Sequence, residues 1–296
     1  MTVTQSNTLQ SGQAMLPQNS YQDEVVLITG GGTGLGKAMA IEFGRLGAKV
    51  AIGSRDATHR EKGVAAVSRI GAQALGVALD VRESQQITRA FDEIESGLGP
   101  VSVIVNNAAG NFPVRAEDLS PNAWTSVLNI GLNGTFLCSR EFGRRAIAAG
   151  RPGAILNISS PQAWTGGPGS AHNASSKAGI EALTKSLAIE WAPYGIRVNS
   201  IAPGFFPHDD QVEAMKAGPA APTEDLADYV PLGRTGKPHE LAWAATYLCS
   251  GFAAFITGHT LVIDGGHWLG RGRYTPKFLP ISAQVPKRER VAGSPS

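Results

Sequence analysis

Three glycines, Gly30, Gly34 and Gly36, lie where a short apolar run changes into a pattern with helical spacing. Glycine lets the backbone turn sharply and approach another group closely, because it has no Cβ atom. A helix that begins here offers unpaired N–H groups and its positive dipole end to an anion. Although glycine also serves plain tight turns, this position between an expected strand and an expected helix predicts a site for a dinucleotide pyrophosphate. The expected contacts are Gly30, Gly32, Thr33, Gly34, Leu35 and Gly36.

The second expected strand ends at Gly53, Ser54 and Arg55. In a dinucleotide site, an acidic residue at this point binds the ribose 2′-hydroxyl and favours NAD(H), whereas an arginine can pair with a 2′-phosphate and favours NADP(H). Asp56 lies beyond the expected strand end. We therefore expect Ser54 and Arg55 to contact the cofactor, and NADPH to be that cofactor. The alternative for Arg55 is an ordinary surface arginine.

Short apolar runs alternate with helical patterns along the chain and define the elements that hold these residues. The expected strands are 24–29, 49–52, 74–79, 101–105, 153–158, 196–201 and 260–263. The expected helices are 35–46, 57–70, 83–95, 121–150 with a break near 131–133, 170–191 and 238–250. This alternation is typical of βαβ units. It predicts an α/β fold: a single doubly wound Rossmann-type domain with a central parallel sheet of about seven strands and helices on both faces.

The composition divides the chain into three parts: a flexible polar leader over 1–21, the oxidoreductase domain over 22–270 and a basic tail over 271–296. The tail carries six Lys/Arg and one Glu. A solvated terminal extension is favoured there over a nucleic-acid or membrane contact. Within the domain, 204–231 is long for a connection and rich in Pro, Ala, Asp and Glu, which predicts a substrate lid.

Overall composition indicates a folded protein, with 42% hydrophobic and 17% charged residues. Cys138 and Cys249 lie far apart within apolar helical patterns, which favours buried free thiols in a reducing compartment. The sequence contains no 18-residue apolar run and no signal-peptide pattern at its start. We therefore expect a cytoplasmic protein that binds neither membrane nor nucleic acid and holds no metal.

The spacing Gly-x-x-x-Gly-x-Gly resembles that of the short-chain dehydrogenase/reductase family. Further matches follow successive strands: Asp80-Val81, Asn106-Asn-Ala-Ala-Gly110, Ser159-Ser160, Ser-Lys177-Ala-Gly and Pro203-Gly204. The resemblance covers about 24–268 and implies a homotetramer, for which 238–263 is apolar enough to form an interface. It also implies further cofactor contacts at Asp80, Val81, Asn107, Ala108, Ala109, Lys177, Pro203, Gly204 and Phe205.

The sequence departs from this family at the position that carries its usual acid. Typical members use Tyr-x-x-x-Lys, in which the phenol exchanges a proton with the substrate oxygen and the lysine lowers its pKa and holds the nicotinamide ribose. Here Asn173 stands at the tyrosine position and Gly131 at that of the usual helix asparagine, while Lys177 and Ser160 remain. A carbonyl reaction of the usual type therefore lacks its proton donor.

One branch of the family, the 2,4-dienoyl-CoA reductases, resembles this chain most, and the most specific match is Asn111-Phe112. That resemblance implies hydride addition to the δ-carbon of a dienoyl thioester. Negative charge then moves onto the thioester oxygen, which needs hydrogen-bond donors. It implies that Asn111 is a donor and that Lys177 holds the ribose and adds positive charge. The alternative for Asn111 is a turn-capping amide.

Three polar residues are candidates to replace the missing tyrosines. Gln162 stands where mitochondrial-type members carry a second tyrosine, and His172 with Lys177 matches the His-x-x-x-x-Lys of peroxisomal-type members. His172 relays a proton or else caps or packs the helix, and Asn173 binds the substrate or caps the helix. The expected catalytic set is Lys177, Asn111, Ser160, Gln162, Asn173 and His172, and the expected substrate contacts are Arg55, Arg82, Phe112 and Gln162.

These residues leave three functions open. The first is an NADPH-dependent reductase of 2,4-dienoyl-CoA thioesters in fatty-acid β-oxidation. The second is a related oxidoreductase that acts on another carbonyl or enoyl substrate. The third is a nucleotide-binding protein without turnover, which Asn173 and Gln162 favour and which the retained Lys177 and Asn111 oppose.

Overall fold

The computed structural model describes residues 10–13, 15–208 and 226–270. The expected basic tail, 271–296, lies outside the described residues, as does 209–225 from the middle of the expected lid. All seven expected strands and the helices between them lie within the described part of the chain.

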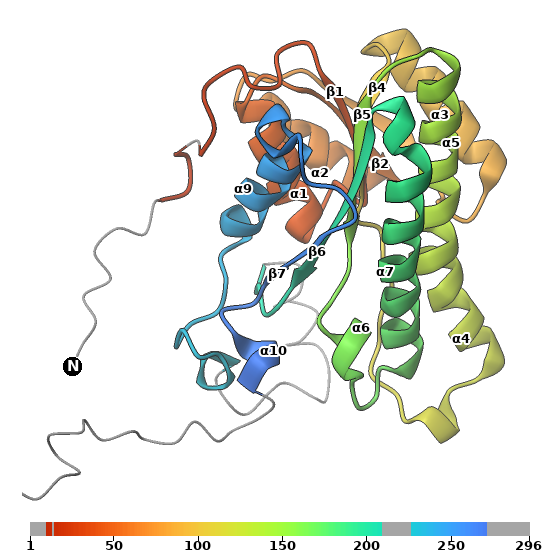
Figure 1. The fold of residues 1–296 in the computed structure, drawn as a ribbon, viewed down its shortest axis with the longest axis vertical. Helices are drawn as coiled ribbons and strands as arrows, with labels where there is room; N and C mark the ends of the chain where they lie inside the picture. Colours follow the sequence, from red (N-terminus) through yellow and green to blue (C-terminus); the bar gives the residue numbers. More distant parts are fainter. Residues whose placement is uncertain (1–9, 14, 209–225, 271–296) are drawn as a thin grey trace, which may run out of the picture.

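Seven parallel strands form one sheet in the order β3-β2-β1-β4-β5-β6-β7 (Figure 1). Their bounds are β1 (Val25–Thr29), β2 (Lys49–Ser54), β3 (Ala74–Ala78), β4 (Val101–Asn106), β5 (Gly153–Ile158), β6 (Ile196–Pro203) and β7 (Thr260–Ile263). The order reverses between β1 and β4, and ligands of open α/β sheets bind at such a point, beyond the carboxyl ends of the strands. This confirms the predicted doubly wound, Rossmann-type sheet.

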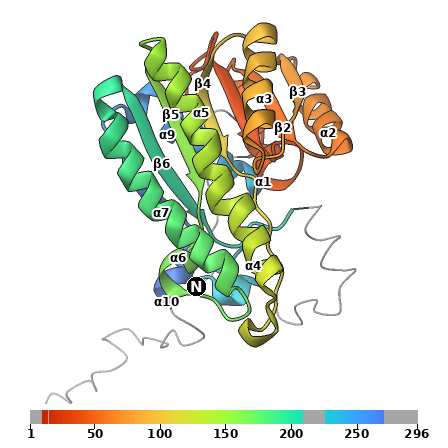
Figure 2. The same ribbon diagram turned by 90° about the vertical axis from the view of Figure 1, so that its right-hand side faces the viewer.

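Helices cover both faces of the sheet (Figures 1 and 2). One face carries α1 (Gly34–Arg45), α2 (Ala57–Ser68) and α9 (Pro238–Cys249), and the other carries α3 (Ser84–Gly97), α5 (Gly134–Ala148) and α7 (Ala171–Trp191). Each face has its own hydrophobic core. Because both faces are covered, all five residues of β1 are buried.

The long helical stretch after β4 is interrupted where the sequence predicts a break. Helix α4 (Pro121–Leu128) passes through a π-helical turn, η2 (Asn129–Asn133), into α5. Gly131 lies in this turn, and a Cβ atom there would stand 2.3 Å from the Oγ of Ser176 on α7. The close approach of the two helices therefore requires a glycine at 131 while Ser176 keeps its place.

The amino-terminal boundary differs from the prediction. Leu16 and Tyr21 are buried, although the sequence assigns them to a flexible leader. The Tyr21 phenol donates to the carbonyl of Thr246 on α9, and its ring meets Phe43 of α1 edge-on with centroids 5.0 Å apart. The packed domain therefore begins before residue 22, because Leu16 and Tyr21 belong to the hydrophobic core on the α1 and α9 face of the sheet.

Two four-residue helices, α6 (Gln162–Thr165) and α10 (His267–Gly270), were not predicted, because one turn is too short to show a hydrophobic period. Cys138 and Cys249 are buried free thiols, as expected. Among the described residues, no helix is long and apolar enough to cross a membrane, and no group of His, Cys, Asp and Glu is suited to hold a metal ion.

Candidate active site

The glycine turn between β1 and α1 has the geometry of an anion site. Gly30 and Gly34 have φ values of +66° and +49°, which strain residues that carry a side chain. A Cβ atom at Gly36 would stand 2.3 Å from the carbonyl oxygen of Gly30. Thr33 precedes α1 without capping it by its side chain, and the first turn holds no acidic residue. The start of this 12-residue helix therefore directs its positive dipole end toward the turn, as an anion site requires.

The loop after β4 is fastened to this turn. The side-chain amide of Asn107 donates to the carbonyls of Thr29 and Gly30, at 3.0 and 3.2 Å. The hydroxyl of Thr29 accepts from the backbone N–H groups of Asn107 and Ala108, both at 3.0 Å. These bonds hold the loop after β4 against the glycine turn that follows β1, at the carboxyl edge of the sheet.

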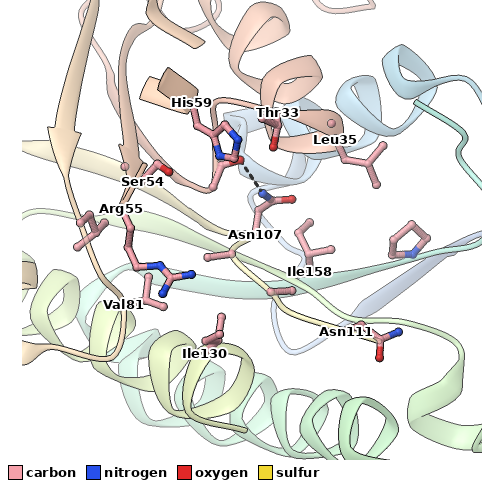
Figure 3. Close-up of a pocket in the computed structure, with 18 of the residues that line it drawn as sticks. Thr33, Leu35, Ser54, Arg55, His59, Val81, Asn107, Asn111, Ile130 and Ile158 are labelled. Carbon is pink, nitrogen blue, oxygen red and sulfur yellow. Dashed lines mark hydrogen bonds between the residues drawn. The ribbon is translucent and has the colours of Figure 1, made fainter. Parts of the chain in front are cut away.

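A cavity of about 610 Å³ opens at that edge (Figure 3). Its size is typical of a small-molecule site. Figure 3 shows Arg55 on one side of the cavity and Asn111 on the other. The cavity brings together most of the expected cofactor and catalytic residues, namely Gly30, Thr33, Gly34, Leu35, Gly36, Ser54, Arg55, Asp80, Val81, Asn107, Ala108, Ala109, Asn111, Asn173, Lys177 and Pro203.

Three expected cofactor contacts do not line this cavity. A Cβ atom at Gly32 would stand 2.0 Å from the carbonyl oxygen of His59, and one at Gly204 would stand 2.5 Å from the Cβ of Asp264. These two glycines therefore allow close packing of neighbouring elements. Phe205 contacts the ring of His267, with centroids 4.7 Å apart, and lines a separate cavity of about 120 Å³.

The end of β2 presents one arginine to the cavity. Asp56 accepts a 3.0 Å hydrogen bond from the backbone N–H of His59 and caps α2, so its carboxylate is already engaged. The side chain of Arg55 is 58% exposed, and its Nη1 lies 3.9 Å from Asp80 Oδ2. Arg82 also binds Asp80, with hydrogen bonds of 2.6 and 2.9 Å. The Arg82 guanidinium lowers the pKa of the Asp80 carboxyl, and Arg55 adds to this effect.

Lys177 is a buried cation on α7. Its Nζ donates a 2.6 Å hydrogen bond to the carbonyl of Ile158 at the end of β5. Burial lowers the pKa of Lys177 from 10.5 to about 8, and the charge of Glu181, one helical turn away, opposes that shift. The Glu181 carboxylate accepts hydrogen bonds from Ser200 of β6, at 3.3 Å, and from Thr260 of β7.

The two positions at which related enzymes carry tyrosines hold carboxamides that contact each other. The Nδ2 of Asn173 donates to the Oε1 of Gln162 at 3.3 Å. The backbone N–H of Gln162 donates to the Oγ of Ser160, also at 3.3 Å. Asn173 lines the cavity, whereas Ser160 and Gln162 do not. No tyrosine lines this cavity within the described chain.

His172 is packed in the interior against an aromatic side chain. It is fully buried, and its ring lies 4.7 Å from that of Phe112, centroid to centroid. Within the described chain, neither ring nitrogen has a hydrogen-bond partner. Neither His172 nor Phe112 lines the cavity, and Arg82 lines a different one with Asn129 and Asn133.

Sequence reasoning missed several lining residues: Gly53, His59, Leu79, Ile130, Ile158, Ser159 and His208. Ile158 and Ser159 adjoin the predicted Ser160 and were recoverable from the strand end. His59 and His208 reach the cavity from segments whose place beside the glycine turn is set by tertiary packing. No local signal identifies them.

Comparison with known proteins gives the family. A family model described as enoyl-(acyl carrier protein) reductase matches residues 30–267. A short chain dehydrogenase from Bacillus anthracis, known from a crystal structure, superposes with a TM-score of 0.76 at 42% identity, over 86% of this chain and 99% of that one. This chain belongs to the short-chain dehydrogenase/reductase family. It is an oxidoreductase, and the family and its Rossmann-type fold imply a nicotinamide dinucleotide cofactor.

Other members of the short-chain dehydrogenase/reductase family are similar over most of their length. A probable 2,4-dienoyl-CoA reductase [(2E)-enoyl-CoA-producing] of Bacillus subtilis is 39% identical and covers 84% of this chain and 98% of its own. A peroxisomal 2,4-dienoyl-CoA reductase [(3E)-enoyl-CoA-producing] of Arabidopsis thaliana is 37% identical, over 90% and 93%. An uncharacterized oxidoreductase of Caenorhabditis elegans is 40% identical, over 89% and 86%.

Proposed function

We propose that this protein reduces 2,4-dienoyl-CoA thioesters with NADPH. The observation that carries the proposal is the composition of one cavity, which joins the glycine turn, Lys177 and Asn111 but holds Asn173 where the family's acid stands. A dienoyl thioester suits this set, because its reduction leaves charge on an oxygen that needs hydrogen-bond donors and places the proton on carbon. The relatives named as 2,4-dienoyl-CoA reductases support the same substrate class.

The chain's own residues divide this work between them. Bound NADPH supplies the hydride that adds to the δ-carbon of the dienoyl group. The Asn111 amide donates to the thioester oxygen as negative charge collects there, and protonated Lys177 adds a positive field in a buried place where charge is weakly screened. The Asn173 carboxamide positions the acyl group, and Gln162 holds that carboxamide in place by accepting its hydrogen bond.

Cofactor preference is assigned to Arg55. Its guanidinium is exposed at the end of β2, while Asp56 is occupied as the cap of α2. The 2′-phosphate of NADPH therefore meets the Arg55 guanidinium. The Asp56 carboxylate, which would favour the free 2′-hydroxyl of NADH, is already bonded to the backbone of His59.

The proposal also covers the contacts to the CoA substrate and the oligomeric state. Arg82, whose side chain is 36% exposed, contacts the phosphates of CoA, and Phe112, 40% exposed, contacts the acyl group. A homotetramer buries the apolar surface around α9 and β7, where Phe252 and Phe255 are exposed.

The test is NADPH oxidation measured with three substrates: 2,4-hexadienoyl-CoA, 2-hexenoyl-CoA and a simple ketone. We expect turnover on the dienoyl ester at least about tenfold faster than on either of the others. Turnover on the enoyl ester instead would favour a related enoyl reductase, in line with the description of the matching family model. Tight NADPH binding without any turnover would favour a binding protein, the alternative that Asn173 suggests.

The role of Asn111 has its own test. Asn111→Ala should lower kcat on the dienoyl ester by about 100-fold, the usual effect of losing an oxyanion donor, and leave the Kd for NADPH within about twofold. Asn133→Ala, which removes an exposed amide that donates to Asn129 within the turn η2, is the matched control. Equal losses in turnover and cofactor affinity would show that Asn111 only shapes the loop.

A further inference from the structure

Two tryptophan rings meet at the surface, outside the cavity at the carboxyl edge of the sheet. Trp164 of α6 and Trp268 of α10 have ring centroids 6.0 Å apart, and Trp164 is 44% exposed. Helix α6 follows β5 and α10 follows β7, so both stand beyond the carboxyl ends of the strands, side by side in Figures 1 and 2. Exposed clusters of large apolar side chains mark binding surfaces in soluble proteins.

Two exposed leucines extend this cluster. Leu269 follows Trp268 on α10, and both Leu269 and Leu232 are among the exposed large hydrophobic residues. The backbone N–H of Leu232 donates to the carbonyl of Gly265, in the turn that leads into α10. Trp164, Leu232, Trp268 and Leu269 thus form an apolar surface built from α6, α10 and the segment before α9.

The apolar surface begins where the cavity ends. Asn173 lines the cavity, and its side-chain amide donates to Gln162, the first residue of α6. Trp164 lies two residues further along the same short helix, and its backbone N–H donates to the carbonyl of Pro161 at 3.1 Å. A ligand chain that leaves the cavity beside Asn173 therefore meets α6 first.

The surroundings of the apolar surface carry little charge. Residues 159–176 contain no Asp, Glu, Lys or Arg. Asp264 is buried, and its carboxylate accepts from the backbone N–H groups of Gly266 and Trp268, at 2.9 and 2.7 Å, which holds α10 in place. The phosphates of CoA require cations, whereas a hydrocarbon chain gains by leaving water for an uncharged, apolar surface.

We propose that the apolar surface binds the distal hydrocarbon chain of the acyl-CoA substrate, so that chains longer than hexadienoyl are preferred. This inference rests on the proposed function, which supplies the acyl-CoA. With the thioester oxygen at Asn111, the carbons beyond the δ-carbon are those that leave the cavity, and a hexadienoyl chain has only one of them. Each further methylene laid on a tryptophan face adds roughly twofold to affinity, which is half, in free energy, of the effect of complete burial.

The experiment is calorimetric titration of the full chain, with NADP⁺ present, by hexanoyl-CoA and by decanoyl-CoA, which are saturated and undergo no reduction. We expect decanoyl-CoA to bind about tenfold tighter or more. Trp164→Ala and Trp268→Ala should each reduce that ratio to about threefold or less, and should leave the Kd for hexanoyl-CoA within about twofold. The unchanged binding of hexanoyl-CoA shows that each variant remains folded. Tyr194→Ala removes an exposed aromatic ring just beyond the other end of α7 and should keep the full ratio.

The outcomes separate this inference from the proposed function. A ratio that both tryptophan variants keep would overturn the inference alone, because acyl-CoA binding would persist. Failure of both acyl-CoAs to bind would reject the proposed substrate class and this inference with it. A tryptophan-dependent ratio without turnover on the dienoyl ester would support the inference and reject only the reaction. If sedimentation shows that Trp164→Ala dissociates an assembly while the ratio stays unchanged, the surface is a contact between copies of the chain and the proposal is wrong.

Discussion

Asn173 donates a hydrogen bond to Gln162, so the two carboxamides that replace tyrosines of related enzymes form one unit. Residues that act as a unit give non-additive effects when they are changed singly and together. We expect Asn173→Ala and Gln162→Ala each to lower kcat/KM on the dienoyl ester by about tenfold, and the double variant to lose little more than the worse single one. Asn133→Ala controls for loss of an unrelated amide pair. Losses that multiply would show that each amide binds the substrate independently.

The position of the new double bond in the product follows from the same pair. Carboxamides do not ionise, so neither Asn173 nor Gln162 is an acid that can deliver a proton to the γ-carbon. A dienolate protonated by water reacts fastest at the α-carbon, where its charge density is greatest. We therefore expect the 3-enoyl thioester, and chromatography against authentic isomers decides it. A 2-enoyl product would reveal a positioned acid near the γ-carbon.

Arg55 should decide cofactor preference. Replacing it by leucine removes a charge-assisted bond to the 2′-phosphate and should raise the Kd for NADPH by about tenfold or more. The Kd for NADH, titrated by fluorescence, should change by less than about threefold. Asp80 stays bound to Arg82, so the local structure survives. Arg69→Leu, at the exposed end of α2, is the control, and equal losses for both cofactors would reject the assignment.

Lys177 should set the alkaline limb of the pH profile. As the pH rises through about 8, Lys177 loses its proton and with it the charge that stabilises the dienolate, so kcat/KM should fall there. The negative charge of Glu181 raises the pKa of Lys177, so Glu181→Gln should move the limb to lower pH. The amide still accepts from Ser200, and Glu190→Gln on the exposed side of α7 is the control. If the alkaline limb stays at the same pH in Glu181→Gln, a group other than Lys177 causes it.

Gly131 and Ser176 should be coupled in stability. A methyl group at Gly131 would stand 2.3 Å from the Ser176 Oγ, which is buried and has no hydrogen-bond partner among the described residues. Gly131→Ala should therefore lower the free energy of unfolding by about 1–3 kcal/mol. Adding Ser176→Ala should restore most of it, because the crowding atom is removed. Urea unfolding of the single and double variants measures this, and simple additivity would contradict it.

Most of the fold was predictable because its signals are local. Apolar runs and helical spacing located seven strands and the helices between them, and the break in the helix after β4 was expected near 131–133 and found at Asn129–Asn133. The residues at strand ends were also predictable as a group, because the carboxyl ends of parallel strands share one edge. The short helices α6 and α10 were missed because four residues show no period.

The remainder of the site depends on contacts between distant segments. His208 meets Gly34 across more than half of the chain, and Asn173 meets Gln162 only because α6 folds against α7. Gly32 resembled a phosphate contact by spacing, yet its backbone approaches His59. Sequence spacing shows that a glycine is needed and leaves open which neighbour requires it.

Tyr21 connects two helices of the domain. Its ring and its phenol join α1 to α9, the first and last long helices of the sheet's one face, from a segment that belongs to neither. A shortened chain that starts at Glu24 would uncover Phe43 and remove the hydrogen bond that Tyr21 makes to Thr246. A tag cleavage site or a start codon placed after Tyr21 would then lower the stability of the folded protein.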